Sequence, residues 1–146
     1  MKTAGQLLTI KGNKIHSIAP NSDVYEALVM MDKHHVGALL VLEAEKLVGI
    51  FTERDYARNV ALKGKTSNNT LVSEAMTSEL ITIGPEKSLE DCMNVMTEKR
   101  VRHLPVLEKG HVIGVLSIGD LVKETISYQQ SLIKQLKFQA KYSNLK

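Results

Sequence analysis

The residues best suited to chemistry form one short motif that occurs twice, at Gly49–Asp55 (GIFTERD) and at Gly114–Asp120 (GVLSIGD). Both copies follow the pattern Gly-h-h-Thr/Ser-x-x-Asp, where h is apolar. The hydroxyl can donate a hydrogen bond to a ribose or phosphate oxygen, and the aspartate can accept two hydrogen bonds from a vicinal diol. A helix that begins at this point would turn its free N–H groups toward an anion. The motif therefore predicts a nucleotide site without a Walker loop, while the simpler alternative is a pair of helix N-caps.

The two motif copies belong to a longer internal repeat. Gly49 and Gly114 are 65 positions apart, and so are Pro20 and Pro85. The alignment needs no gap between Ile15 and Ala57. A constant offset of this kind indicates that one ancestral unit was duplicated. We therefore expect two related but non-identical ligand sites, and the repetition favours the ligand interpretation over capping alone.

Each repeat is expected to fold as β-α-β-β-α, which is an α+β pattern. The first helix carries apolar residues at helical spacing. These residues are Val24, Ala27, Leu28 and Met31 in the first repeat, and Leu89, Cys92, Met93 and Met96 in the second. Ser22 and Ser88 are the predicted N-caps. The predicted strands are 17–20, 36–42 and 47–51, matched by 82–85, 101–107 and 112–116, and the second helices begin near Arg54 and Gly119.

The last segment has no counterpart in the first repeat. Between Asp120 and about Lys141 there is no proline or glycine, which predicts a long helix. Its residues at spacing 4-3-4-3-4 form a heptad seam. The seam consists of Val122, Ile126, Gln129, Ile133, Leu136 and Ala140. This helix either packs on its own domain or forms a dimer contact. The tail also carries Lys134, Lys137, Lys141 and Lys146 and no acid after Glu124, as a solvated face would.

Composition narrows the function classes. Apolar residues make up 43% of the 146, charged residues 24%, and the net charge is +3, which permits an anionic small ligand without requiring nucleic acid. Cys92, the one cysteine, lies on an apolar stripe and fits a reducing compartment. No leader or membrane-length apolar run is expected, so the predicted location is the cytoplasm. The five histidines show no i, i+4 pair, so no metal site is expected. The sequence supplies no base beside Cys92, so no catalytic residue is expected either.

The duplicated unit with its two intact motifs resembles a tandem CBS domain pair, also called a Bateman module. The resemblance covers the chain from about Leu7 to Glu124 and divides it into repeat one (7–65), repeat two (66–126) and a C-terminal helical extension (127–146). The segment Val72–Met76 resembles the stretch that precedes a second CBS repeat. The fold implied is two β-α-β-β-α repeats packed with pseudo-two-fold symmetry, and two such modules usually pair into a flat disc.

The resemblance also implies a ligand class. CBS pairs bind adenosine derivatives in clefts between the repeats, with AMP expected here and ATP, ADP, NAD(H) or S-adenosylmethionine as alternatives. The motif aspartate holds ribose, the hydroxyl contacts ribose or phosphate, and adenine lies near the residues before the proline and against the first long strand. The nucleotide-binding residues expected in this sequence are Ser17, Ile18, Ala38, Thr52, Arg54, Asp55, Thr82, Ile83, Arg102, His103, Leu104, Pro105, Ser117 and Asp120.

The two sites are expected to differ in chemistry. Arg102 and His103 can bind phosphate, whereas their counterparts in repeat one are Gly37 and Ala38. An ordinary ion pair is the alternative role for Arg102. Conversely, Arg54 corresponds to Gly119. Arg58, Lys63 and Lys65 are expected to be solvated rather than bound to a phosphate tail.

The sequence thus predicts a regulatory adenine-nucleotide sensor without catalytic activity, working as a homodimer on a separate, unidentified protein. Two other classes stay open. One is an enzyme that acts on a nucleotide, although no metal triad, general base or nucleophile elbow is present in the sequence. The other is an interaction scaffold or nucleic-acid binder that uses the basic C-terminal helix, although the aromatic residues, 4% of the chain, do not alternate with its lysines.

Overall fold

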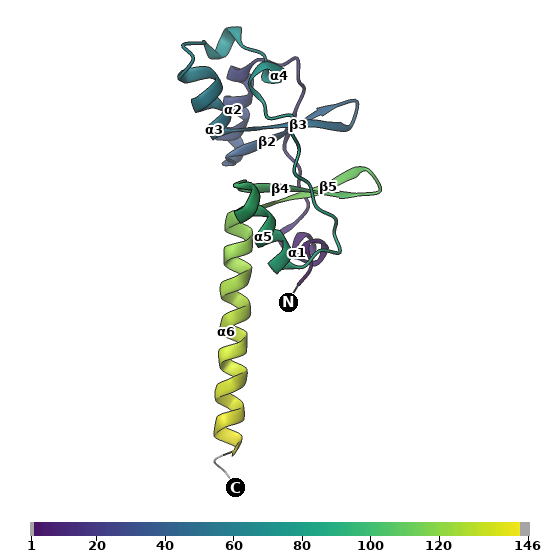
Figure 1. The fold of residues 1–146 in the computed structure, drawn as a ribbon, viewed down its shortest axis with the longest axis vertical. Helices are drawn as coiled ribbons and strands as arrows, with labels where there is room; N and C mark the ends of the chain where they lie inside the picture. The colour runs from purple at the N-terminus through teal and green to yellow at the C-terminus, as the bar shows by residue number, and fades with distance from the viewer. Residues whose placement is uncertain (1, 144–146) are drawn as a thin grey trace.

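The computed structural model describes residues 2–143 and shows two similar lobes, one above the other, with a long helix running away from them (Figure 1). The first lobe contains β1 (Ser17–Ile18), α2 (Val24–His34), β2 (Ala38–Glu43), β3 (Lys46–Thr52) and α3 (Glu53–Tyr56), which continues as a π-helix over Ala57–Ala61. The second contains α5 (Leu89–Lys99), β4 (His103–Glu108), β5 (His111–Ser117) and the start of α6 (Ile118–Ser143). The short helices α1 (Ala4–Lys11) and α4 (Val72–Ala75) each precede a repeat, and a 3-10 turn covers Ser67–Asn69. The predicted α+β fold of two related units with a long C-terminal helix is confirmed.

The offset of 65 seen in the sequence is kept in the backbone. Helix α2 begins at Val24 and α5 at Leu89, and the β2–β3 and β4–β5 ladders are both antiparallel. Both ladders also carry a register shift at equivalent places, after Val41 and after Val106. The duplication therefore extends to irregularities that composition alone does not specify.

The opening strand differs between the lobes. In the first lobe β1 pairs in parallel with β2, and the Leu40 N–H donates to the His16 carbonyl at 3.1 Å. The residue equivalent to Leu40 is Pro105, which has no N–H to donate. The predicted strand 82–85 is consequently reduced to a single bridge between Ile83 and Val106.

The N-caps of the two equivalent helices are Asp23 and Ser88. The Asp23 side chain accepts from the Glu26 N–H at 2.8 Å, and the Ser88 hydroxyl accepts from the Asp91 N–H at 3.0 Å. The prediction of Ser88 is confirmed, and that of Ser22 is wrong. An N-cap side chain accepts a hydrogen bond from the backbone N–H three residues later. In this helix that N–H belongs to Glu26, so Asp23 is the cap and Ser22 lies one residue too early.

The segment that precedes each repeat packs on the other repeat. Helix α1 contributes Ala4, Leu7 and Leu8 to the core of the second lobe. Helix α4 contributes Val72 and Ala75 to the core of the first. Burying a side chain the size of leucine contributes about 1.5–3 kcal/mol, so these contacts firmly attach each segment to its host lobe. Each hydrophobic core therefore combines residues of one repeat with residues of the segment that precedes the other repeat.

Backbone hydrogen bonds repeat this exchange in both lobes. The N–H groups of Ala4 and Gly5 donate to the carbonyls of Lys87 and Pro85, at 2.8 and 2.9 Å. In the other lobe Val72 and Ser73 donate to Ser22 and Pro20, at 2.8 and 3.0 Å. Since Pro20 and Pro85 are equivalent, the segments that begin at Thr3 and Leu71 are equivalent as well.

The motif glycines lie where the exchanged segments cross the sheets. A Cβ on Gly49 would stand 2.5 Å from the Met76 sulfur and 3.0 Å from the Thr77 carbonyl oxygen. A Cβ on Gly114 would stand 2.6 Å from a methyl group of Leu8. The sequence left open whether these glycines admit a ligand or a neighbouring chain segment, and the structure places a chain segment beside each of them.

Helix α6 touches the body of the protein only near its beginning. Leu121 is its buried residue, the Thr125 hydroxyl contacts the Met93 sulfur at 3.5 Å, and Lys2 pairs with Glu124 at 2.7 Å. Farther along, the helix projects from the second lobe (Figure 1), and Ile133 is 51% exposed. Packing of the whole helix on its own domain is therefore wrong for the described residues. Lys146 of the basic tail lies outside them.

We expect Gly49→Ala to lower the free energy of unfolding by about 1–3 kcal/mol, because the new methyl group must displace the Met76 side chain and the backbone at Thr77. Gly119→Ala is the matched control, since its Cβ would meet only the Ser117 hydroxyl, at 3.7 Å, and it should shift the same quantity by less than about 0.5 kcal/mol. Urea denaturation measures both. Equal values for the two variants would contradict the close approach.

Candidate functional site

Two cavities between the lobes contain residues of the repeated motif, and each is built from both repeats. Site A, of about 650 Å³, contains Thr52 and Asp55 of the first motif together with Arg102, His103 and Pro105 from the second lobe. Site B, of about 450 Å³, contains Ser117 of the second motif together with residues 38–40 of β2. Both volumes fall within the roughly 300–1,000 Å³ of small-molecule pockets.

In site A the motif aspartate is held by three hydrogen bonds. Asp55 Oδ2 accepts from the Thr52 N–H at 2.9 Å and from the Thr52 hydroxyl at 3.1 Å. Asp55 Oδ1 accepts from the Thr77 hydroxyl at 2.8 Å. The Asp55 N–H in turn donates to Thr52 Oγ1, which completes a capping box at the start of α3. The capping alternative is thereby confirmed as one role of this pair, and Asp55, although only 8% exposed, still lines the cavity.

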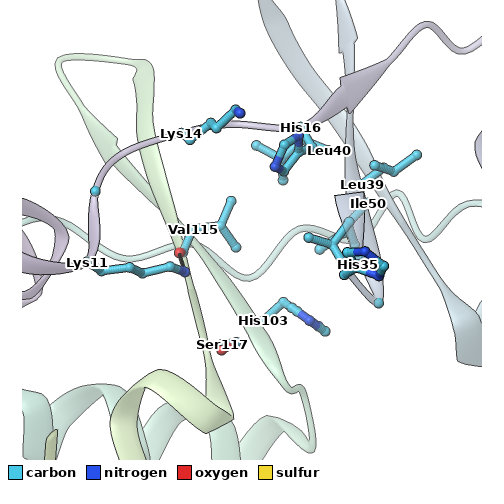
Figure 2. Close-up of a pocket in the computed structure, with 14 residues that line it drawn as sticks. Lys11, Lys14, His16, His35, Leu39, Leu40, Ile50, His103, Val115 and Ser117 are labelled. Carbon is cyan, nitrogen blue, oxygen red and sulfur yellow. Dashed lines mark hydrogen bonds between the residues drawn. The ribbon is translucent and has the colours of Figure 1, made fainter. Parts of the chain in front are cut away.

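In site B the corresponding aspartate has a cation as its partner. Asp120 Oδ2 accepts from the Ser117 N–H at 2.8 Å and from Lys11 Nζ at 2.5 Å. Burial would raise the pKa of Asp120, but the hydrogen bonds from Lys11 and Ser117 outweigh burial, so this pKa lies below its ordinary value. Lys11 Nζ also donates to the Val115 carbonyl at 2.6 Å. Figure 2 shows the Lys11 side chain reaching this carbonyl along one side of site B.

Positive side chains line both cavities but differ in kind. Site A is lined by four arginines, Arg54, Arg58, Arg100 and Arg102, and by the acidic residues Glu53 and Glu79. Within residues 2–143 the ion pairs are Lys2–Glu124 and Lys11–Asp120, so none of these arginines is paired there. For the described residues, the ion-pair role considered for Arg102 is therefore not observed. Because unpaired guanidinium groups bind phosphate bidentately, site A suits a phosphorylated ligand.

Site B instead carries lysines and histidines. Lys11, Lys14, His16, His35 and His103 line it, and Figure 2 shows His35 on the side opposite Lys11. The pKa of His16 is lowered by burial and further by its neighbours His34 and Lys14. The lowered pKa favours the neutral form of His16, so this imidazole adds less positive charge to the cavity than an ordinary histidine would.

His103 belongs to both cavities and separates them. It lines site A and site B, as do Gly37 and Ile50. Burial lowers the pKa of His103 and the Lys11 cation lowers it further, against the opposing effect of Asp120 and Glu53. The imidazole is consequently neutral at pH 7, with one nitrogen able to donate and the other to accept a hydrogen bond. The two cavities are therefore adjacent and share one wall.

The residues predicted from the sequence distribute unequally over these cavities. Site A gathers Thr52, Arg54, Asp55, Arg102, His103 and Pro105. Site B gathers Ala38, His103 and Ser117. Neither cavity is lined by the remaining predicted residues, which are Ser17, Ile18, Thr82, Ile83, Leu104 and Asp120. Among these, Ile18, Ile83 and Leu104 are buried in the two hydrophobic cores.

Several lining residues were missed or misjudged from the sequence. Arg58 lines site A although it was expected in solvent, whereas Lys63 and Lys65 line neither cavity. Thr77 and Lys11 were not considered, because each meets its aspartate across a long sequence separation. The threonine-to-glutamine spacing of Thr3 and Gln6, which forms a capping box, was the available signal for the helix that carries Lys11.

The described part of the chain contains neither a group of metal-ligating side chains nor a membrane-spanning helix. Across residues 2–143, no three histidine, cysteine, aspartate or glutamate side chains are grouped so as to hold a metal ion. The helices in the same range include none with the length and apolar character needed to span a bilayer.

Known proteins of similar sequence and structure share this architecture. The chain is 41% identical over 118 residues to the mitochondrial CBS domain-containing protein CBSX3 of Arabidopsis thaliana, which covers 77% of this chain but only 57% of that protein. It is 33% identical over 118 residues to the CBS domain-containing protein YhcV of Bacillus subtilis (strain 168), covering 81% of this chain and 84% of YhcV. The structure of a candidate signal-transduction protein with CBS domains from Burkholderia ambifaria MC40-6 superposes with a TM-score of 0.83 and 44% identity, over 86% of this chain and 95% of that one. The profile of the CBS domain family matches residues 10–62 and 72–127, and the chain therefore belongs to the CBS domain family as a tandem pair.

Proposed function

We propose that this CBS pair is a regulatory module that binds an adenine nucleotide, AMP foremost, and has no catalytic activity of its own. The observation that carries the proposal is the composition of the cavities. Each combines the motif of one repeat with the first long strand of the other. The polar groups of a nucleotide and its apolar base therefore both find complementary surfaces in one place.

Site A provides the groups that a nucleotide requires. An ionised carboxylate offers about four acceptor positions, and three at Asp55 are used, so a ribose hydroxyl can take the fourth or replace the Thr77 hydroxyl, which can rotate away. Arg54 and Arg102 line the same cavity and would bind a phosphate, and Ile50, Ile81 and Pro105 would form an apolar surface for the base. ADP, ATP, NAD(H) and S-adenosylmethionine share the adenosine part and are the alternative ligands.

Regulation would follow from the position of the ligand between the lobes. A nucleotide in site A touches α3 of the first lobe and β4 of the second, so its binding energy depends on how the lobes are arranged. A ligand shifts a conformational equilibrium by the difference between its affinities for the two states. We propose that the arrangement favoured by the nucleotide is read by a separate target protein.

The cellular setting is part of the same proposal. Burial raises the pKa of the Cys92 thiol, with the Asp91 carboxylate adding to the effect, so the thiol stays protonated and unreactive. A buried thiol of this kind fits the reducing cytosol, where we place the protein.

We further propose that the projecting part of α6 mediates homodimer formation. Ile126, Ile133 and Leu136 of the predicted seam are 50, 51 and 57% exposed. Their spacing is that of a two-helix coiled coil, in which a second copy would cover them. An interaction with nucleic acid through the lysines of α6 is the second possibility for this surface, but the exposed apolar seam favours a protein partner.

The function is tested by calorimetric titration with AMP, followed by ATP, ADP, NADH and S-adenosylmethionine. We expect Asp55→Asn to weaken AMP binding at least about tenfold, the loss typical of a hydrogen bond to a charged group. Asp120→Asn should weaken it less than about threefold, because site A holds the four arginines.

Asp91→Asn is the matched control, because Asp91 occupies the same capping-box position in α5 and lines neither cavity. Equal losses from Asp55→Asn and Asp120→Asn would contradict the inequality of the sites. If folded, nucleotide-free protein gives no heat with any of the five ligands, the motifs act only as helix caps and the sensor proposal fails.

The dimer proposal is tested by measuring mass in solution. Wild-type protein should have twice the 16.2 kDa of one chain, and the double variant Ile126→Gln/Ile133→Gln should weaken dimer formation at least about tenfold. Ser127→Gln/Lys134→Gln changes the adjacent positions off the seam and should leave the dimer intact. Dimers of equal strength in the two variants would exclude the seam as the contact.

A further inference from the structure

Lys11 holds in site B the place that Thr77 holds in site A. In the first lobe, Thr77 donates its N–H to the Ile50 carbonyl at 2.9 Å and its hydroxyl to Asp55. In the second lobe, Lys11 Nζ makes both equivalent bonds, to the Val115 carbonyl and to Asp120. In site A the carbonyl and the carboxylate therefore accept from a neutral N–H and a neutral hydroxyl. In site B the equivalent carbonyl and carboxylate accept from a single cation.

This substitution changes how the aspartate meets the cavity. Asp55 lines site A, whereas site B is lined by Lys11 and Ser117 and not by Asp120. The Lys11 ammonium group thus lies at the carboxylate that would otherwise face a ligand. The side chains of Lys11 and Asp120 are 35% and 23% exposed, and partly exposed ion pairs of this kind contribute little to stability. A ligand can therefore displace Lys11 from Asp120.

We propose that Lys11 is a specificity-determining residue of site B. Its ammonium group pairs with Asp120 when no ligand is bound, so that binding there depends on an anionic group in the ligand. The proposal rests on the nucleotide-binding function proposed above and concerns how its second site chooses among adenosine compounds.

The charge of the ligand decides whether Lys11 keeps an anionic partner after it leaves Asp120. A neutral nucleoside that takes the carboxylate with its diol would leave Lys11 without its anionic partner. A nucleotide brings a phosphate that can pair with the displaced ammonium group, so the cation exchanges one anion for another. In site A no such exchange arises, since the Thr77 hydroxyl is neutral. Site B should therefore prefer AMP over uncharged adenosine more strongly than site A does.

Calorimetric titration of the Asp55→Asn/Arg102→Ala protein with AMP and with adenosine isolates site B, because both residues line site A and neither lines site B. In this background, we expect Lys11→Met to bind adenosine about threefold more tightly and AMP several-fold more weakly, so that the preference for AMP over adenosine falls about tenfold. Methionine keeps the length and packing of the lysine stem. Lys11→Arg retains the cation and should retain the preference.

Lys2→Met is the matched control, because it removes the lysine–carboxylate pair with Glu124 while Lys2 lines neither cavity. It should leave the affinities for both AMP and adenosine unchanged. If both ligands bind and their ratio is the same in Lys11→Met and the unmodified background, the role of Lys11 is wrong while the sensor function stands. If the folded background protein binds neither ligand, nucleotide binding at site B fails, and the role of Lys11 fails with it.

Discussion

The exchange of two short segments between the lobes is the constraint on which the rest of the structure depends. Residues beginning at Thr3 pair with the second lobe, and residues beginning at Leu71 pair with the first, through equivalent backbone bonds. The motif glycines, Gly49 and Gly114, are where these segments cross the sheets. Because each lobe is completed by chain from outside its own repeat, the two repeats are held face to face, and both cavities lie between them.

The same exchange makes the two cavities unlike. After crossing Gly49, the segment in the first lobe continues to Thr77, whose hydroxyl reaches Asp55. In the second lobe the equivalent segment is still helical and ends at Lys11, whose ammonium group reaches Asp120. The difference between the two sites therefore arises less from the duplicated motifs than from the segments that run beside them. One segment stays helical as far as Lys11, whereas the other leaves its helix after Ala75.

Much of this architecture could be predicted from the sequence because it is local and duplicated. The 65-residue offset gave the repeated order of elements, and the Gly-h-h-Thr/Ser-x-x-Asp motif marked the correct strand–helix junctions. The same offset, applied to Ser88, would have identified Asp23 as the first cap. What could not be predicted depends on contacts across the chain, since Lys11 meets Asp120 over 109 positions. The lost first strand of the second repeat follows from Pro105, whose missing N–H matters only once its partner strand is known.

A crystal structure of the protein with AMP would show whether a nucleotide binds between the repeats through residues of both. We expect AMP in site A, with its ribose hydroxyls on Asp55 of the first repeat and its phosphate on Arg102 of the second. AMP bound on the surface of a single lobe, with the Thr77–Asp55 and Lys11–Asp120 hydrogen bonds intact and both cavities empty, would contradict this expectation.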